Sequence, residues 1–355
     1  MNYANKNIQR MKPYCPPLNG RREYTGLNLD FNERTIPTSK KVLTKIREYL
    51  ENPDLQMYPE YGGFEEKIAG YVGTDESKMM ITNGSDQGID LIFRTFTDVG
   101  DKVVIPVPSF AMFFQCAEVR ANNILKIPYN DDYTYPIEKV LKEIEKGVKL
   151  VVICNPNNPT GTLTPLEDIE QILRAALEKD TLVYVDEAYY EFSKVSAVTL
   201  LDKYPNLIVT RTFSKAFGLC SLRIGYVIAS EEIIGEMLKI RGPYDMNMIS
   251  YIAAMEALND IEDLEMYVNE VMNIGKPILE EFFEENGIKF YPSGTNFLFF
   301  APENRDKTWQ ALKDNGILTR KKNGLNDEPI IRITIGTSKQ MKQVINVFKK
   351  YIINS

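Results

Sequence analysis

The chain has 355 residues, 44% hydrophobic and 26% charged, which is typical of a folded globular protein large enough for two domains. A net charge of -7 and a pI near 5.1 offer no basic face to a phosphodiester backbone, so nucleic acid is not an expected partner. The sequence lacks histidine, which excludes Ser-His-Asp and Cys-His nucleophile systems and histidine-based zinc sites, and no metal site is expected.

Residues 1–45 are rich in proline, asparagine and arginine and show little periodicity. We expect them to form an arm that packs on a smaller domain or on a neighbouring subunit. Residues 1–17 lack the apolar core of a signal peptide, and no apolar run approaches the length of a membrane span. The four cysteines form no CxxC pair. These features predict a cytoplasmic protein with reduced thiols and no membrane partner.

Residues 46–242 are expected to form a large domain. Short apolar runs that are typical of strands alternate with stretches whose apolar residues recur at helical spacing. This alternation predicts an α/β fold, with a mostly parallel sheet flanked by helices. The predicted strands are 79–82, 102–107, 149–154, 182–187, 207–212 and 225–229, and the predicted helices are 86–98, 136–147 and 165–180.

The pattern changes after residue 242. A long stretch with helical periodicity covers residues 247–287, and strand-like runs follow at 296–301 and 330–336. Residues 243–355 are therefore expected to form a smaller α+β domain.

Polar residues follow several of the predicted strands in the large domain, at 83–86, 155–161, 186–189 and 213–215. Ligands of open α/β sheets bind beyond the carboxyl ends of the strands. If these strands are neighbours, the polar groups converge on one pocket.

Lys215 and Asp186 are the strongest candidates for chemistry in that pocket. A lysine is ordinarily a solvated surface charge, and an aspartate after a strand often only caps the next helix. Lys215, however, lies between a buried-type strand and the apolar run 216–219, a setting that favours a neutral, nucleophilic amine able to form a Schiff base. Asp186 follows an apolar run, and a buried carboxylate needs a cationic partner, which a protonated pyridine nitrogen would supply.

The segment GSDQG at 84–88 begins a predicted helix, where backbone N–H groups and the helix dipole favour phosphate. Arg223 would add a fixed positive charge. Taken singly, these residues also fit a capped helix and a surface salt bridge.

The motifs CNPNNPTG at 154–161, VDEAYYEF at 185–192 and TFSKAFGLCSLRIGY at 212–226 occur in that order after strand-like runs. Together they resemble the aspartate-aminotransferase-like superfamily, whose cofactor is pyridoxal 5′-phosphate. The resemblance covers nearly the whole chain. It implies that residues 46–242 bind the cofactor and that the partners are a small amino donor and an oxo-acid or ketone acceptor.

Carried over to this sequence, the resemblance implies that Lys215, Asp186 and Tyr189 are catalytic. Lys215 would hold the cofactor covalently and move a proton, and Asp186 would pair with the pyridine nitrogen. Asn158 and Tyr189 would hydrogen-bond the phenolic oxygen, while Phe110 would stack on the ring. The implied phosphate cup consists of Gly84, Ser85, Asp86, Thr212, Ser214 and Arg223. Tyr58, in QMYPEYGG, matches a tyrosine that reaches the cofactor of the other subunit, which implies a homodimer.

Within the superfamily the chain looks most like histidinol-phosphate aminotransferases, on the segments KPYCPP, GILTR and IIRITIGT. This likeness implies that Tyr14, Asn32, Arg320 and Arg332 bind the substrate. A pair of arginines suits a phosphate dianion, whereas one suffices for a carboxylate.

Some residues depart from the usual pattern of that family. Phe110 replaces a commoner tyrosine, Asp245 replaces an asparagine, and Arg34 interrupts an asparagine-proline motif. Arg34, Arg241 and Asp245 are candidates for a reshaped substrate pocket, so another small phosphorylated amine or ketone is an open alternative.

The sequence also leaves alternative functions open. An aromatic amino acid aminotransferase, or a decarboxylase of a phosphorylated amino acid, would use the same cofactor. An effector module of a transcription factor would need a DNA-binding helix-turn-helix and a basic patch, and the sequence has neither. A cofactor-free structural protein would leave the joint presence of Lys215, Asp186, Asn158 and Arg223 unexplained.

Overall fold

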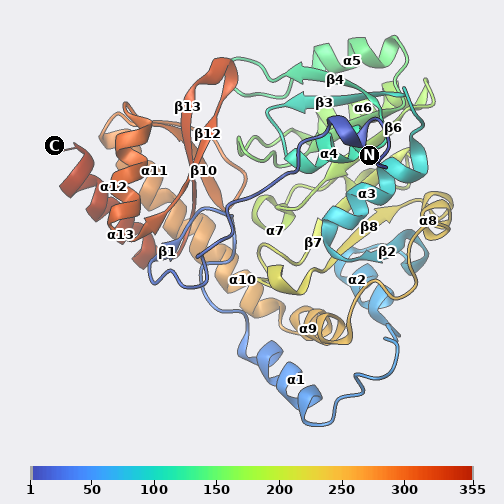
Figure 1. The fold of residues 1–355 in the computed structure, drawn as a ribbon, viewed down its shortest axis with the longest axis horizontal. Helices are drawn as coiled ribbons and strands as arrows, with labels where there is room; N and C mark the ends of the chain where they lie inside the picture. The colour runs from blue at the N-terminus through green and yellow to red at the C-terminus, as the bar shows by residue number, and fades with distance from the viewer. Residues whose placement is uncertain (1–2, 354–355) are drawn as a thin grey trace.

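The computed structural model describes residues 3–353 and places two larger sheets beside each other, as Figure 1 shows. The large sheet contains β2 (Met79–Thr82), β3 (Lys102–Val107), β4 (Asn123–Pro128), β5 (Leu150–Cys154), β6 (Leu182–Asp186), β7 (Leu207–Thr212) and β8 (Gly225–Ala229). The small sheet contains β9 (Lys289–Tyr291), β10 (Phe297–Ala301), β12 (Arg320–Asn323) and β13 (Pro329–Thr334). A separate parallel pair joins β1 (Leu27–Asn28) to β11 (Ile317–Leu318).

The large sheet has the strand order β2-β8-β7-β6-β5-β3-β4. The pairs β7–β6, β6–β5, β5–β3 and β3–β4 are parallel, whereas β8 runs antiparallel to both of its neighbours. The mostly parallel sheet predicted from the sequence is therefore confirmed. β4, at the edge, was not predicted; its residues are only partly buried and lack the continuous apolar run of the inner strands.

Helices cover both faces of this sheet, and successive residues of each strand point to opposite faces. In β5, Val152 and Cys154 pack in one apolar cluster, and Val151 and Ile153 pack in the other. The helices of the chain are α1 (Lys40–Glu51), α2 (Phe64–Val72), α3 (Gly84–Phe96), α4 (Ala111–Val119), α5 (Ile137–Glu145), α6 (Leu166–Leu177), α7 (Tyr190–Ser193), α8 (Glu231–Leu238), α9 (Met248–Asn259), α10 (Ile261–Asn269), α11 (Lys276–Glu285), α12 (Arg305–Asp314) and α13 (Ser338–Phe348).

The helical stretches expected over residues 247–287 are present in the structure as α9, α10 and α11. α9 ends at Asn259, and a segment of π-helix, Glu270–Gly275, separates α10 from α11. α9 packs against α1 and α2, and α11 packs against α13 beside the small sheet. We propose that the large domain begins before α1 and includes α9, because the expected boundaries at 45/46 and 242/243 would divide α1 and detach α9 from its neighbours.

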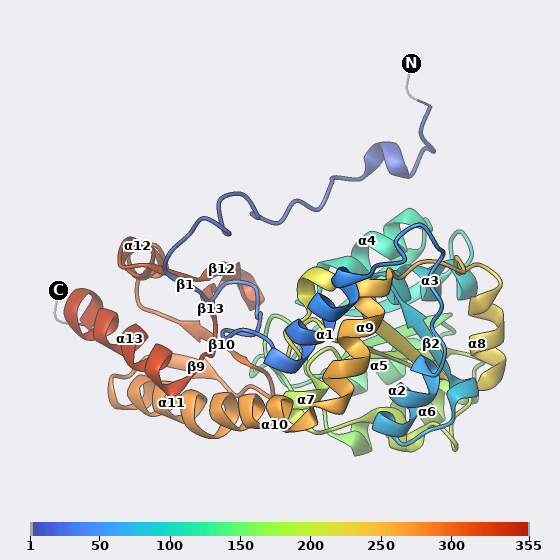
Figure 2. The same ribbon diagram turned by 90° about the horizontal axis from the view of Figure 1, so that it is seen from below.

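The N-terminal segment leaves the body of the molecule before β1, as Figure 2 shows. It is anchored at its far end where the amide of Asn7 donates to the carbonyl of Val119 at the end of α4. Among residues 3–353, none of the helices has the length and apolar character needed to cross a lipid bilayer.

One close backbone approach joins the large sheet to α3. A Cβ added at Gly225 in β8 would lie 2.4 Å from the backbone nitrogen of Ser85 and 2.6 Å from the carbonyl carbon of Gly84. β8 can therefore pass this close to the start of α3 only without a side chain at that position.

We predict that Gly225→Ala destabilises the protein by about 1–3 kcal/mol, because the backbone at the start of α3 must shift. The matched control is Gly235→Ala in α8, where an added Cβ meets nothing within 4 Å, and a helix gains up to about 1 kcal/mol from that change. Urea unfolding followed by circular dichroism measures both. Equal midpoints for the two variants would contradict the prediction.

Candidate active site

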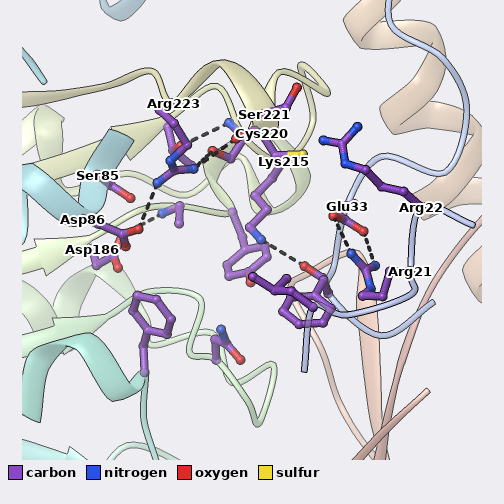
Figure 3. Close-up of a pocket in the computed structure, with 18 of the residues that line it drawn as sticks. Arg21, Arg22, Glu33, Ser85, Asp86, Asp186, Lys215, Cys220, Ser221 and Arg223 are labelled. Carbon is purple, nitrogen blue, oxygen red and sulfur yellow. Dashed lines mark hydrogen bonds and ion pairs between the residues drawn. The ribbon is translucent and has the colours of Figure 1, made fainter. Parts of the chain in front are cut away.

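The carboxyl ends of β5, β6 and β7 open into one cavity of about 700 Å³. The register places Cys154 of β5 opposite Asp186 of β6, and Asp186 opposite Thr210 of β7, so the segments that follow these strands lie together. From the predicted set, the cavity is lined by Ser85, Asp86, Phe110, Asn158, Asp186, Tyr189, Thr212, Ser214, Lys215 and Arg223. Figure 3 shows Lys215 reaching into this space between Arg223 on one side and Arg21 on the other.

The amine of Lys215 has no acidic partner in the cavity. Its Nζ donates to the backbone carbonyl of Phe31 at 3.1 Å and lies 5.7 Å from the ring of Tyr189. Burial, and then the positive charge of Arg332, lower the pKa of Lys215 to about 8. A larger fraction of this amine than of an exposed lysine is consequently neutral near physiological pH, and the neutral form is the nucleophile.

Asp186 is a buried carboxylate without a cation beside it in the described chain. Its Oδ1 accepts from the N–H of Ala188 at 3.1 Å and from the hydroxyl of Thr210 at 3.3 Å. Burial raises the pKa of Asp186 to about 7, and the charge of Asp86 adds to this rise. A cationic ligand next to this carboxylate would stabilise its ionised form.

The start of α3 and the loop before β8 form a polar cup at the edge of the cavity. Arg223 donates to Asp86 at 2.9 Å and to the hydroxyl of Ser214 at 3.4 Å. Gly84 has φ +73°, and a Cβ there would lie 2.5 Å from Nη2 of Arg223. The cup therefore depends on glycine at this position, and the N-terminal N–H groups of α3 make it suitable for a phosphate.

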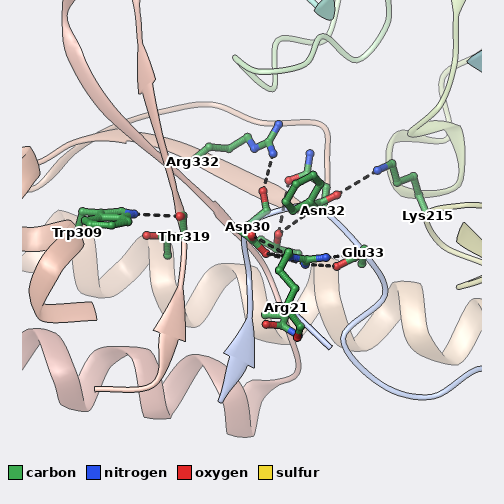
Figure 4. Close-up of polar contacts among 11 residues, drawn as sticks. Arg21, Asp30, Asn32, Glu33, Lys215, Trp309, Thr319 and Arg332 are labelled. Atoms are coloured by element: carbon green, nitrogen blue, oxygen red, sulfur yellow. Dashed lines mark hydrogen bonds and ion pairs between the residues drawn. The ribbon is translucent and has the colours of Figure 1, made fainter. Parts of the chain in front are cut away.

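Two amide side chains connect the cavity to the small sheet. Asn32 donates to the hydroxyl of Tyr189 at 2.8 Å, and Arg332 donates to Oδ1 of Asn158 at 2.6 Å. Arg332 also donates to the carbonyl of Asp30 at 2.8 Å, a contact visible in Figure 4. Burial raises the pKa of the Tyr189 phenol, and Arg332 opposes that rise.

Arg320 lies directly opposite Arg332 in the antiparallel pair β12–β13. Its guanidinium stands 4.9 Å from the ring centre of Phe31, a residue that lines the cavity. One guanidinium nitrogen of Arg320 is buried without a hydrogen-bond partner in residues 3–353. Burial lowers the pKa of Arg332, and the charge of Arg320 lowers it further.

Six predicted residues are not among those that line the cavity, namely Tyr14, Asn32, Tyr58, Gly84, Arg320 and Arg332. Two of these, Tyr58 and Tyr14, are exposed at the surface. Tyr58 is 74% exposed and stacks on Tyr244, with ring centres 4.3 Å apart. Tyr14 is also exposed, although its phenol is near enough to influence the pKa of Arg332.

The candidates for a reshaped pocket do not line the cavity. Arg34 forms an ion pair with Asp263 at 2.9 Å. Arg241 donates to the carbonyl of Ile81 at 3.0 Å, and Asp245 accepts from the amide of Gln87 at 2.5 Å. The side chains of these residues are therefore held by partners elsewhere in the chain.

Several cavity residues were not identified from the sequence, chiefly in the N-terminal segment. Phe31 supplies the carbonyl that holds Lys215, and Arg21 lies 4.3 Å from the Phe31 ring centre. Arg21 is paired with Asp30 and Glu33, as Figure 4 shows, and the pair with Glu33 is also visible in Figure 3. The N-terminal segment has no regular periodicity from which its position could be predicted. The one indication in the sequence was that Arg21 lies close to the KPYCPP segment.

Comparison with known proteins assigns this arrangement to a family. The family model for aminotransferase class I and II matches residues 24–348. The chain belongs to the class I and II aminotransferases. A histidinol-phosphate aminotransferase of Thermoanaerobacter sp. (strain X514) is 35% identical over 331 residues, covering 92% of this chain and 93% of that protein.

Solved structures agree with this assignment. The histidinol-phosphate aminotransferase from Sinorhizobium meliloti, in complex with pyridoxal-5′-phosphate, superposes with a TM-score of 0.88 at 25% identity and covers 98% of each chain. The aspartate aminotransferase from Thermus thermophilus with maleate has a TM-score of 0.82 at 19% identity, which shows a shared fold. This aminotransferase therefore uses pyridoxal 5′-phosphate and takes an amino donor and an oxo-acid acceptor.

The residues of the cavity fit this cofactor. The carboxylate of Asp186 lacks a cationic partner in the described chain, as a protonated pyridine nitrogen requires. The lowered pKa of Lys215 favours reaction of its amine with an aldehyde. In the phosphate cup, the backbone of Gly84 lies so close to the guanidinium of Arg223 that no side chain fits between them. When bound, pyridoxal phosphate withdraws electrons from the α-carbon of an attached amine.

We predict that the protein freed of cofactor captures pyridoxal phosphate at a rate that rises with pH and levels off above about 8. The neutral amine is the reacting form, and the pKa of Lys215 is lowered to about 8 from 10.5. Stopped-flow absorbance measures the rate, and free α-N-acetyllysine, tested in parallel, corrects for titration of the cofactor. Lys215→Arg, which stays charged, should capture none. A corrected rate that climbs steadily to pH 10.5 would contradict the lowered pKa.

Proposed function

We propose that this enzyme transfers the amino group of histidinol phosphate to 2-oxoglutarate. The observation that carries the proposal is the pair Arg320 and Arg332, which lie opposite each other in β12–β13 and form no ion pair with an acidic residue in the described chain. Two guanidinium groups without an internal counter-ion suit an anion with several oxygens, such as a phosphate ester. The curated relatives named histidinol-phosphate aminotransferase support the same substrate.

In this proposal the large domain holds the cofactor. Asp186 keeps the ring nitrogen protonated, Phe110 covers the ring, and Asn158 and Tyr189 bind its phenolic oxygen. The phosphate lies at the start of α3, in the cup made by Gly84, Ser85, Asp86, Thr212, Ser214 and Arg223. Hydroxyl groups, helix N–H groups and one guanidinium there all donate hydrogen bonds.

The substrate is held between the two sheets. Lys215 would accept the proton of the substrate α-carbon and return it, a role that its lowered pKa favours. Arg320, Arg332 and Tyr14 bind the distal phosphate. Asn32 positions Tyr189 through the 2.8 Å hydrogen bond between them. In this arrangement the amino group of the substrate lies at Lys215, and its phosphate lies at the small sheet.

We also propose a homodimer in which Tyr58 contacts the cofactor phosphate of the partner subunit. The exposed and stacked rings of Tyr58 and Tyr244, together with the exposed side chains of Leu55 and Met57, support an interface at this surface. The free thiols support a reducing compartment, and we propose the cytoplasm.

We predict that Arg320→Gln lowers kcat/KM for histidinol phosphate on the order of a hundred-fold, because a buried charged contact to the phosphate is lost. The loss for histidinol, which lacks the phosphate, should be several-fold smaller. Formation of glutamate from 2-oxoglutarate measures turnover in both cases. Equal losses for the two amines would contradict the assignment, and carbon dioxide released from phosphoserine without 2-oxoglutarate would favour a decarboxylase.

The shared site can be tested by mixing two weakened subunits. We predict that Lys215→Ala and Tyr58→Ala proteins, each nearly inactive alone, regain activity after joint unfolding and refolding. In a mixed dimer, one site combines the intact Lys215 of one subunit with the intact Tyr58 of the other. If Tyr58 served its own subunit, neither site would be complete and mixing would restore nothing.

A further inference from the structure

A third cation, Lys322, shares a face of the small sheet with Arg320 and Arg332. Alternate residues of a strand point to the same side, so Arg320 and Lys322 of β12 lie on one face. Arg332 lies directly opposite Arg320 on the neighbouring strand, and Ile330 lies opposite Lys322. Arg332 bonds to Asn158, so this is the face that looks toward the cavity.

The neighbouring Lys321 belongs to the other face. Its Nζ lies 3.1 Å from the carboxylate of Asp306 and 4.4 Å from the ring centre of Trp309, both on α12. The same strand therefore carries two lysines in different surroundings: Lys321 has a carboxylate and an aromatic ring beside it, whereas Lys322 turns away from α12.

Lys322 has no carboxylate beside it in the described chain to offset its charge. Its amine forms no hydrogen bond or ion pair with any of residues 3–353, although its side chain is partly buried. Burial is the main cause that lowers the pKa of Lys322 to about 8, and the charges of Arg332 and Arg320 lower it further. The two arginines also lack acidic partners, and each has a buried guanidinium nitrogen without a hydrogen bond.

The cluster differs in this respect from a neighbouring arginine. Arg21, on the nearby N-terminal segment, is neutralised by Asp30 at 2.7 Å and Glu33 at 2.5 Å. Three like charges held together without an anion raise the free energy of the folded protein. A bound anion that touches all three would remove that cost.

We propose that Lys322 is the third cation of the site for the distal phosphate of the amino donor, and that it selects a phosphate ester over a carboxylate. This inference rests on the proposed function and deepens it by assigning a specificity residue. A carboxylate carries one charge and two oxygens, which Arg320 and Arg332 can satisfy between them. A phosphate monoester carries nearly two charges at neutral pH and three free oxygens, which leaves one oxygen and one charge for an ammonium group.

The test compares Lys322→Met with Lys321→Met as the matched control, both as holoenzymes. Single-turnover rates give the apparent Kd for histidinol phosphate and for glutamate, and inorganic phosphate is titrated as a competitor of glutamate. Lys322→Met should raise the Kd for histidinol phosphate and the inhibition constant for inorganic phosphate on the order of ten-fold, the value of one charge-assisted hydrogen bond. The Kd for glutamate should rise several-fold less.

The controls separate this contact from a loss of structure. Lys321→Met should match the wild-type protein in all three constants, and Lys322→Arg should restore most of the phosphate binding. Thermal unfolding and cofactor absorbance, measured on each variant, report the fold and the loaded site independently of turnover.

Each outcome bears on one of the two proposals. If Lys322→Met leaves the constants for histidinol phosphate and inorganic phosphate unchanged, or raises the Kd for glutamate equally, the role of Lys322 is overturned. If the wild-type protein does not turn over histidinol phosphate, the proposed function fails. Inhibition by inorganic phosphate still decides the role of Lys322 in that case.

Discussion

A buried carboxylate without an internal cation is the constraint on which the site depends. Asp186 ends β6, the strand between β5 and β7, so the sheet itself fixes its position. Both hydrogen bonds to its side chain end on Oδ1, and burial raises its pKa to about 7. The fold thus carries a group whose ionised form, supported by these two hydrogen bonds alone, would be stabilised further by a cationic ligand. The pyridine ring of the cofactor would be such a ligand, and the neighbouring strands place Asn158 and Lys215 around the same space.

The two sheets contribute different electrostatics to this space. On the large sheet, Arg223 is already paired with Asp86, so helix N–H groups and hydroxyls supply much of the attraction for a phosphate. On the small sheet, Arg320 and Arg332 have no acidic partner in the described chain. Phe31 connects these regions, because its carbonyl holds Lys215 while its ring lies beneath Arg320. In the proposed function, an anion bound at the small sheet would be linked through Phe31 to the amine of Lys215.

The sequence predicted the inner strands and the groups that follow them because burial on both faces leaves continuous apolar runs, as in β5 and β7. It missed β4, whose exposed positions interrupt such a run. Contacts between residues far apart in the chain could not be predicted from the sequence either. Arg34 was a pocket candidate, yet its ion pair with Asp263 joins residues far apart in the chain, and only the folded structure brings them together.

The strand β12 shows why the substrate end of the site is harder to predict than the cofactor end. Lys321 and Lys322 are adjacent and chemically identical, and a four-residue strand offers no periodicity long enough to tell which side faces the cavity. Only the pairing of Arg320 with Arg332, and of Lys322 with Ile330, settles the question. A shift of one residue in that register would exchange the two lysines and send Lys322 toward α12. The charge at the proposed substrate site is thus set by strand pairing, which depends on packing between segments distant in the sequence.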